Sequence, residues 1–288
     1  MKYYFIVIST FLVALLLSIF ASQNTLIYNN IPAIYYSFII IFIIQWIGFF
    51  PSFYFKTEHY FDLIGSFTFI ITIFFSFFLK YDFIDRLPET RSLFFLFAIS
   101  IWSIRLGSFL FLRVKKQKRD VRFVEIKKSF SRYFMTWNLQ GLWVFMCSLP
   151  AITSIYSNFV EIGIYFYIGS IIWTIGFFIE IIADYQKNVF SKNKVNKGKY
   201  ITTGLWSLSR HPNYFGEILL WLGITIVAFP TITGLQYFSL ISPLFVYILL
   251  TRISGINFLE AIGDRRWGSD DGYKKYKSKT PILFPRLF

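Results

Sequence analysis

The chain has 288 residues, of which 56% are hydrophobic, 23% are aromatic and only 15% are charged. A soluble domain of this length needs far more polar surface to cover its core, so this composition excludes an ordinary soluble protein. Apolar runs of about 20 residues, the length that crosses a bilayer, recur along the chain. The composition therefore predicts an all-α, polytopic transmembrane helical bundle.

Six apolar runs follow one another before the polar segment near residue 200, at residues 3–21, 31–55, 62–79, 92–112, 133–149 and 161–183. A last apolar block, residues 218–250, is too long for one ordinary span, and Pro230, Thr231 and Gly234 interrupt it near the middle. We divide it into two short helices, which gives about seven to eight spanning helices. No internal repeat or linker divides the chain, so we expect one membrane domain, 1–288, with residues 1–60 as its N-terminal helices.

The formal charge of +14 is concentrated in residues 113–132, residues 187–210 and the tail after Arg252. These segments are expected in the cytoplasm, whereas the loops 22–30 and 150–160 carry no Lys or Arg and are expected on the other side. Both termini, including the C-terminal tail, are then cytoplasmic. We interpret the basic runs as topology signals and anionic-lipid contacts, so no nucleic-acid partner is predicted.

Two pairs of polar side chains lie near the ends of apolar runs, where a buried carboxylate usually faces a cavity or a partner. Glu180 and Asp184 are four residues apart, which puts both on one face of a helix, and Asn213 and Glu217 repeat this spacing. If the two helix ends face each other, these side chains line one cleft. The alternative is that Glu180 and Asp184 end a helix beside lysines while Asn213 caps the next helix.

The turn Arg210-His211-Pro212 supports the first interpretation. Proline presets the first turn of the helix that follows and leaves neighbouring N–H groups free to point at an anion. The other histidine, His59, is far away in the sequence, and no metal-binding motif is present, so no metal site is predicted.

The segment from Gly204-Leu-Trp to Asn213-Tyr-Phe-Gly-Glu217 resembles the signature of the steroid 5-alpha-reductase-like membrane proteins, specifically their bacterial branch known as DUF1295. Further blocks resemble that family in the same order, over about residues 61–288: Asp62, Trp102–Gly107, Leu149-Pro150, Gly176–Asp184, Asn196–Gly198, Ser254–Ile256 with Glu260, and Tyr273–Tyr276.

The resemblance implies a bundle whose active site opens to lipid and whose C-terminal helices hold NADPH. By this resemblance Asp184, Asn213 and Glu217 are cofactor contacts, and Arg105 is carried over in the same way. Arg210 and His211 are added on their chemistry alone. The predicted cofactor site also includes the neighbouring Glu180, Tyr214 and Tyr273.

The implied reaction is hydride transfer from NADPH to an activated double bond of an apolar substrate, such as a sterol-like, isoprenoid or lipid molecule. The animal reductases present a tyrosine to the substrate carbonyl, and here that position holds Trp102, which is no general acid. Asp62 is the candidate for the acidic partner of that tyrosine and the candidate catalytic residue, and to act as the donor it would have to be protonated.

Two alternatives to a reductase stay open. The pattern Arg-His-Pro-x-Tyr-x-Gly, with a late Glu and a Tyr-x-x-Tyr segment, is also similar to isoprenylcysteine carboxyl methyltransferases and membrane phospholipid methyltransferases, which bind S-adenosylmethionine. Asp184, Asn213 and Glu217 favour the reductase. The other alternative is a non-catalytic membrane protein that binds a lipid headgroup. The abundance of Ile, Phe, Lys, Tyr and Asn is compatible with a bacterial plasma membrane protein.

Overall fold

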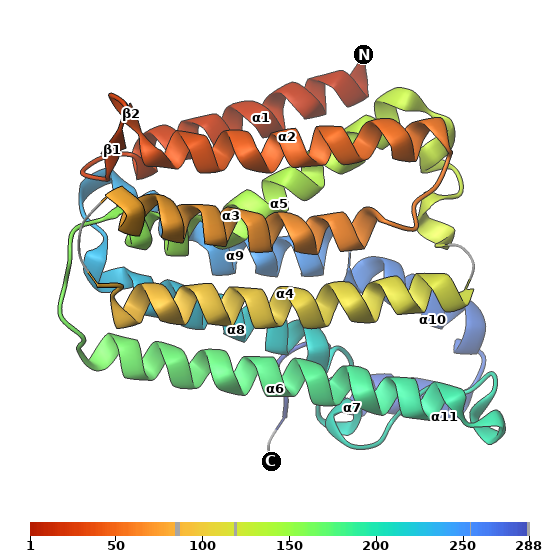
Figure 1. Ribbon diagram of the computed structural model, residues 1–288. Coiled ribbons are helices and arrows are strands. Elements are labelled where there is room, and N and C mark those ends of the chain that lie inside the picture. The colour runs from red at the N-terminus through yellow and green to blue at the C-terminus, as the bar shows by residue number, and fades with distance from the viewer. Residues whose placement is uncertain (84–86, 118–119, 254, 287–288) are drawn as a thin grey trace. The chain divides into compact units, whose positions relative to one another are not determined.

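A computed structural model of the chain describes residues 1–83, 87–117, 120–253 and 255–286 (Figure 1). Within these residues eight helical segments are long and apolar enough to cross a membrane, and the predicted helical membrane fold is confirmed. The α-helices are α1 (Lys2–Ala21), α2 (Ala33–Tyr54), α3 (Phe61–Phe83), α4 (Thr90–Gln117), α5 (Phe130–Tyr156), α6 (Ile164–Lys192), α7 (Leu205–Leu208), α8 (Pro212–Ala228), α9 (Ser242–Ile248), α10 (Ile256–Trp267) and α11 (Asp271–Lys279).

Short helical turns connect several of these helices. Five are 3₁₀ turns, and the sixth is π-helical and continues α9. The six turns are η1 (Val121–Phe123), η2 (Ile126–Lys128), η3 (Lys194–Asn196), η4 (Phe229–Thr231), η5 (Gly234–Ile241) and η6 (Leu249–Ile253).

The last apolar block divides near Pro230, as predicted: α8 ends at Ala228, and the eighth candidate span begins at Gly234. The predicted loop 150–160 is wrong in its first half, because α5 continues through Pro150 to Tyr156. Every residue from Val144 to Ser157 is buried, so tertiary packing holds this helix across a residue that would break an exposed one.

The expected loop 22–30 contains a small hairpin. Strand β1 (Ile27–Tyr28) pairs antiparallel with strand β2 (Ile31–Pro32), and Asn29 and Asn30 form the turn with φ values of 47° and 62°. Asparagine tolerates this left-handed conformation better than most residues, which explains why a two-residue turn forms here.

The contacts within the chain define two compact units. Unit 1 comprises Met1–Phe166 and Val227–Ser242, and unit 2 comprises Tyr167–Ile226 and Pro243–Phe288. The expectation of one domain with a boundary after residue 60 stays a prediction.

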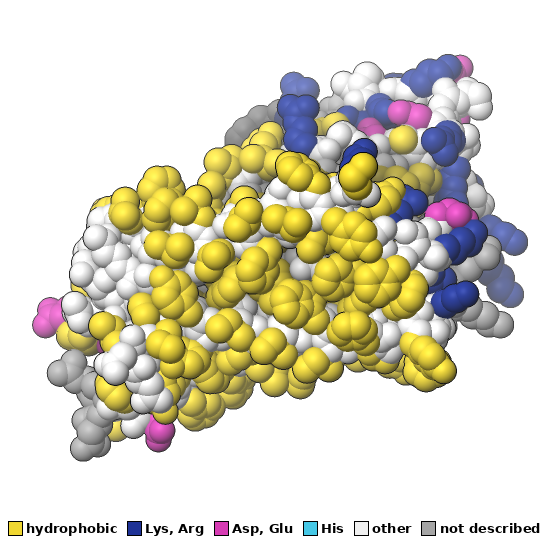
Figure 2. Space-filling model, turned by 90° about the horizontal axis from the view of Figure 1, so that it is seen from above, with side chains coloured by type: hydrophobic (Ala, Val, Ile, Leu, Met, Phe, Trp, Pro, Cys, Tyr) yellow, Lys and Arg dark blue, Asp and Glu magenta, His cyan; other side chains and the backbone are white. Residues whose placement is uncertain are grey.

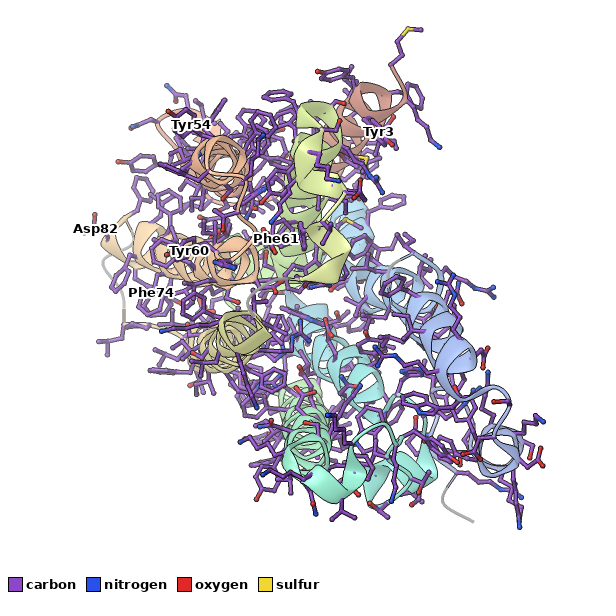
Figure 3. The ribbon with its side chains drawn as sticks, turned by 90° about the vertical axis from the view of Figure 1, so that its right-hand side faces the viewer. Tyr3, Tyr54, Tyr60, Phe61, Phe74 and Asp82 are labelled. Atoms are coloured by element: carbon purple, nitrogen blue, oxygen red, sulfur yellow. The ribbon has the colours of Figure 1, made fainter. Side chains whose placement is uncertain are left out.

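Helix α5 is the central element of unit 1 and contacts α1, α2, α3 and α4. At one end of the unit the rings of Phe61 and Trp137 meet edge to face at 5.1 Å, which joins the start of α3 to α5. Figure 3 labels Phe61 at this position. At the other end the buried Lys80 ammonium pairs with Glu89 at 3.0 Å and donates to the carbonyl of Ser157 at 3.2 Å. Buried charges are thus paired where the helices of unit 1 end.

Apolar side chains also cover the outside of unit 1. Figure 2 shows hydrophobic side chains across the visible face and Lys and Arg side chains gathered towards one end of it. Along α1, large apolar residues such as Phe5, Ile8, Leu12 and Leu16 are exposed. Contiguous apolar surface of this extent fits contact with the lipid bilayer.

Unit 2 is organised by a close crossing of α6 and α8. The glycines on each helix are seven residues apart, Gly169 and Gly176 on α6 and Gly216 and Gly223 on α8. A Cβ atom built on Gly176 would lie 2.6 Å from the carbonyl oxygen of Gly216. Small residues at this spacing let two helix backbones touch, so these glycines fix which faces of α6 and α8 meet.

We expect Gly223→Leu to destabilise the protein by about 2 kcal/mol or more, because overpacking here displaces backbone. A Cβ at this position would lie 2.6 Å from both the Gly169 carbonyl oxygen and the Trp173 amide nitrogen. Thermal unfolding in detergent measures the loss. Gly163→Ala is the control, since a Cβ there meets nothing within 4 Å. Equal unfolding temperatures for the two variants would contradict the crossing.

Candidate functional site

Most of the predicted site residues lie in unit 2, on α6, on α8 with the turn before it, and on α11. They are Glu180, Asp184, Arg210, His211, Asn213, Tyr214, Glu217 and Tyr273. Asp62 and Arg105 lie in unit 1, on α3 and α4 respectively.

The glycine crossing brings the carboxylates of α6 beside the start of α8. A Cβ built on Gly216 would lie 2.7 Å from the backbone nitrogen of Glu180, so α8 touches α6 at this carboxylate. One turn further, Asn213 Nδ2 donates to Asp184 Oδ1 at 3.3 Å. Glu180, Asp184 and Glu217 are all buried. The two helix ends therefore face each other, which is the condition under which the sequence analysis expected these side chains to line one cleft.

The alternative role of Asn213 as a helix cap is wrong. Helix α8 begins at Pro212, so Asn213 is already its second residue, and its amide bonds to Asp184 on the other helix. Proline at the first position has no N–H to leave unsatisfied, which explains why α8 starts there.

The turn before α8 is held by the C-terminal segment of the chain. Arg210 N donates to the carbonyl of Pro281 at 2.9 Å, and Ser209 Oγ donates to the carbonyl of Leu283 at 2.7 Å. Ser209 Oγ also accepts from His211 N at 3.2 Å. These bonds fix the backbone of the turn, so the side chains of Arg210 and His211 leave it in defined directions.

Both of these side chains meet Glu260, which lies on α10. Arg210 Nη1 pairs with Glu260 Oε2, and His211 Nε2 lies 3.0 Å from Glu260 Oε1. Lys277 Nζ, on α11, lies 3.2 Å from Glu260 Oε2 and 2.6 Å from Asp264 Oδ1. Glu260 is therefore the acceptor that joins the turn before α8 to α10 and α11. We define the Glu260 cluster as the side chains of Arg210, His211, Glu260, Asp264 and Lys277.

The imidazole of His211 is neutral at pH 7. Burial lowers its pKa, the hydrogen bond to Glu260 raises it, and the nearby charges of Lys187 and Arg210 lower it further. Because Glu260 can only accept, Nε2 carries the proton. The contact is then a hydrogen bond rather than an ion pair.

Sequence analysis assigned no site role to several residues of this region: Trp206, Glu260, Asp264, Tyr276 and Lys277. Tyr276 Oη donates to the carbonyl of Trp206 at 2.7 Å, and Trp206 Nε1 donates to the carbonyl of Ala183 at 3.0 Å. Burial raises the pKa of Tyr276, so its phenol stays protonated. Lys277 belongs to the Glu260 cluster, and its position four residues after Tyr273 on a helix was the available signal.

The structure gives Asp62 a partner in unit 1. Its carboxylate lies 3.9 Å from the guanidinium of Arg122. The catalytic role of Asp62 stays a prediction. Trp102 is buried and packs edge to face against Phe69 at 5.2 Å, as a core residue does.

We expect Glu260→Gln to destabilise the protein by about 2 kcal/mol, because it removes the charge that Arg210 and Lys277 share in a largely buried place. Chemical or thermal unfolding in detergent measures this. Glu125→Gln is the matched control, since the Glu125–Lys128 pair is exposed at 65% and 63% and such pairs contribute about 0.5 kcal/mol or less. An effect no larger than that of the control would show that the Glu260 cluster is not buried.

We expect His211 to make the protein less stable as pH falls from about 7 to 5.5. The folded-state pKa lies below the usual value of about 6.5, so the unfolded chain takes up the proton first and is favoured as pH decreases. His211→Asn should flatten the stability curve in this window, measured by unfolding at a series of pH values. Identical slopes for the two proteins would mean that the histidine is not buried neutral.

Comparisons with known proteins agree with the DUF1295 resemblance. The family described as "Protein of unknown function (DUF1295)" matches residues 48–280. A curated relative, "Probable O-methyltransferase ustE" of Ustilaginoidea virens, is 38% identical over 68 residues, which are 24% of this chain and 24% of that protein. The match thus spans about a quarter of each chain. No solved structure matches this chain. Because the family match covers most of the sequence, the chain belongs to the DUF1295 family of membrane proteins.

Proposed function

We propose that this protein is a membrane-embedded O-methyltransferase that uses S-adenosylmethionine to methylate an apolar acceptor carrying a hydroxyl or carboxylate group. The sequence alone ranked an NADPH-dependent reductase first. The contacts in unit 2 and the partial similarity to a probable O-methyltransferase now put the methyltransferase ahead.

The Glu260 cluster is the observation that carries the proposal. The methyltransferase pattern consists of Arg-His-Pro-x-Tyr-x-Gly, a late Glu and a Tyr-x-x-Tyr segment, and these parts are separated by tens of residues in the sequence. In unit 2 the Arg and His of the first part both contact the late Glu260, and Lys277, next to the Tyr-x-x-Tyr segment, contacts it too. The first two parts of the pattern thus meet in one polar cluster, and Lys277 links the end of the third part to it.

The type of buried charge is also suited to this cofactor. S-adenosylmethionine carries a cationic sulfonium and an ammonium group, which carboxylates attract, whereas the phosphates of NADPH are repelled by carboxylates. Glu180, Asp184 and Glu217 supply three buried carboxylates at the meeting of α6 and α8. Arg210 is a suitable partner for the cofactor's carboxylate, because its guanidinium presents several N–H donors.

When bound, S-adenosylmethionine would supply an electrophilic methyl group: the acceptor oxygen would bond to the methyl carbon, and the electron pair of the broken C–S bond would stay on sulfur. A hydroxyl acceptor would release its proton to a neighbouring base or to water, and a carboxylate acceptor would need no proton transfer. The residues of unit 2 would bind and orient the cofactor. The substrate is expected to reach the protein from the bilayer.

The NADPH-dependent reductase is the second candidate. The hydrogen bond between Asn213 and Asp184 favours it, since the resemblance to steroid 5-alpha-reductase-like proteins assigns both residues to the cofactor. The proton donor is the weak point, because the family's tyrosine position holds Trp102, a buried core residue whose indole is no general acid. For either reaction we propose a bacterial plasma membrane location with the basic segments and both termini in the cytoplasm.

Direct binding tests the proposal. We expect purified protein in detergent micelles to bind S-adenosylmethionine and not NADPH, and Asp184→Asn to weaken binding about tenfold or more by removing a buried charge. Isothermal titration calorimetry measures both. The matched control is Asp271→Asn, whose carboxylate is 93% exposed and which should bind as the original protein does.

Each other result identifies a different function. Binding of NADPH alone, lost on Asp184→Asn, would replace the methyltransferase by the reductase. A protein that folds but binds neither cofactor would support the non-catalytic alternative.

A further inference from the structure

Helix α6 carries a continuous apolar stripe on its exposed side. Large apolar residues recur at spacings of four and three positions, which is one face of a helix, and each is at least 43% exposed: Ile171, Ile175, Phe178, Ile182, Tyr185 and Val189. Since α6 is one of the candidate spans, this stripe is suited to lie against a hydrocarbon chain.

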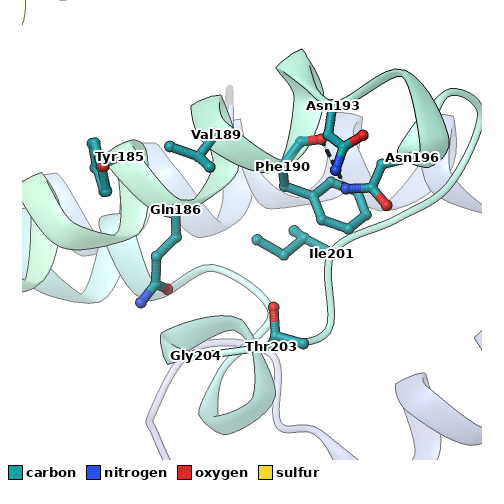
Figure 4. Close-up of a pocket in the computed structure, with 9 residues that line it drawn as sticks. All are labelled: Tyr185, Gln186, Val189, Phe190, Asn193, Asn196, Ile201, Thr203 and Gly204. Atoms are coloured by element: carbon teal, nitrogen blue, oxygen red, sulfur yellow. Dashed lines mark hydrogen bonds between the residues drawn. The ribbon is translucent and has the colours of Figure 1, made fainter.

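The stripe ends in a pocket. A cavity of about 330 Å³ lies between the last turns of α6 and the chain that returns to α7, and Tyr185 and Val189 of the stripe belong to its wall (Figure 4). Phe190 and Ile201 complete the apolar side. The surface of the stripe therefore continues into the cavity.

Three amide side chains also line the cavity, those of Gln186, Asn193 and Asn196. Asn196 Nδ2 donates to the carbonyl of Phe190 at 3.1 Å. The Gln186 side chain fits against Gly204, whose φ is +62°, because a Cβ there would lie 2.5 Å from Gln186 Nε2. The pocket is thus lined by both apolar side chains and amide groups (Figure 4).

Four lysines lie next to the pocket residues in the sequence. Lys192, Lys194, Lys197 and Lys199 alternate with the pocket residues Asn193 and Asn196, and all four are exposed. Lys192 lies in the last turn of α6, where a cation compensates the helix dipole. For Lys194, Lys197 and Lys199 the described residues offer no ion-pair partner.

We propose that this pocket binds an anionic phospholipid, with an acyl chain along the stripe of α6 and the headgroup phosphate between the amides and Lys194, Lys197 and Lys199. The inference is independent of the cofactor proposed above. A free phosphate would use only the amides and lysines, whereas a phospholipid also uses the apolar wall that continues from the stripe. Juxtamembrane lysines also attract anionic lipids by about 1 kcal/mol each. Continuity of the wall with the lipid-facing stripe favours the phospholipid.

The experiment compares phosphatidylglycerol with phosphatidylcholine on the full-length protein in detergent, using native mass spectrometry to measure bound lipid. We expect phosphatidylglycerol to be retained preferentially. The double variant Lys194→Gln/Lys197→Gln should weaken its binding about tenfold. The matched control is Lys275→Gln/Lys279→Gln, which removes two exposed lysines of α11 that lie away from the pocket walls.

A second pair of variants tests the apolar wall without changing any charge. Val189→Asn places an amide on the wall and should reduce phosphatidylglycerol retention, whereas Val195→Asn, 73% exposed and outside the pocket lining, should not. Equal losses of phosphatidylglycerol binding in both double lysine variants would show attraction to net charge alone and would overturn the proposal. An unchanged retention in Val189→Asn would also overturn it. Displacement of the lipid by glycerol 3-phosphate at the same concentration would identify a free-phosphate site instead.

Discussion

The contact between the glycines of α6 and α8 is the constraint on which unit 2 depends. Two helices that meet through side chains are separated by 8–10 Å, whereas glycine lets their backbones touch. At this crossing Gly216 lies against the backbone of Glu180. The polar groups one turn away, Asp184 and Asn213, are consequently within hydrogen-bonding distance at 3.3 Å. A bulky residue at the crossing would move these groups apart, so the candidate site depends on the close packing of α6 and α8.

The Glu260 cluster has a similar dependence on chain segments that are distant in the sequence. Arg210 and His211 are oriented by a turn whose backbone bonds to residues 281 and 283, and their common acceptor lies about 50 residues away. The C-terminal tail is therefore part of the structure of the site. The sequence analysis attributed its basic residues to topology and anionic-lipid contacts, yet Lys277 pairs with both Glu260 and Asp264.

The end of α6 combines features of a membrane surface and of a binding pocket. An apolar stripe leads to a cavity with amide groups and exposed lysines. Such an arrangement combines apolar and polar groups, as a phospholipid does. The basic segment that the sequence analysis interpreted as a topology signal is the one to which we assign the anionic headgroup.

The sequence by itself determined the membrane fold, because hydrocarbon imposes long apolar helices, and hydropathy alone located all eight segments. It also determined that Glu180 and Asp184 share a face, since helical spacing is local. The prediction that Pro150 begins a loop was wrong because α5 continues to Tyr156. The burial that stabilises this helix beyond Pro150 comes from contacts with distant parts of the chain, which the local sequence does not reveal.

Only the tertiary structure decided which polar residues meet. Asn213 is able to cap a helix or to bond across to Asp184, and the crossing of α6 and α8 selects the second. In the same way, the pairing of Arg210 and His211 with Glu260 depends on the return of α10 and α11 to the start of α8. No local pattern encodes such a return, because it results from the packing of all helices of unit 2 together.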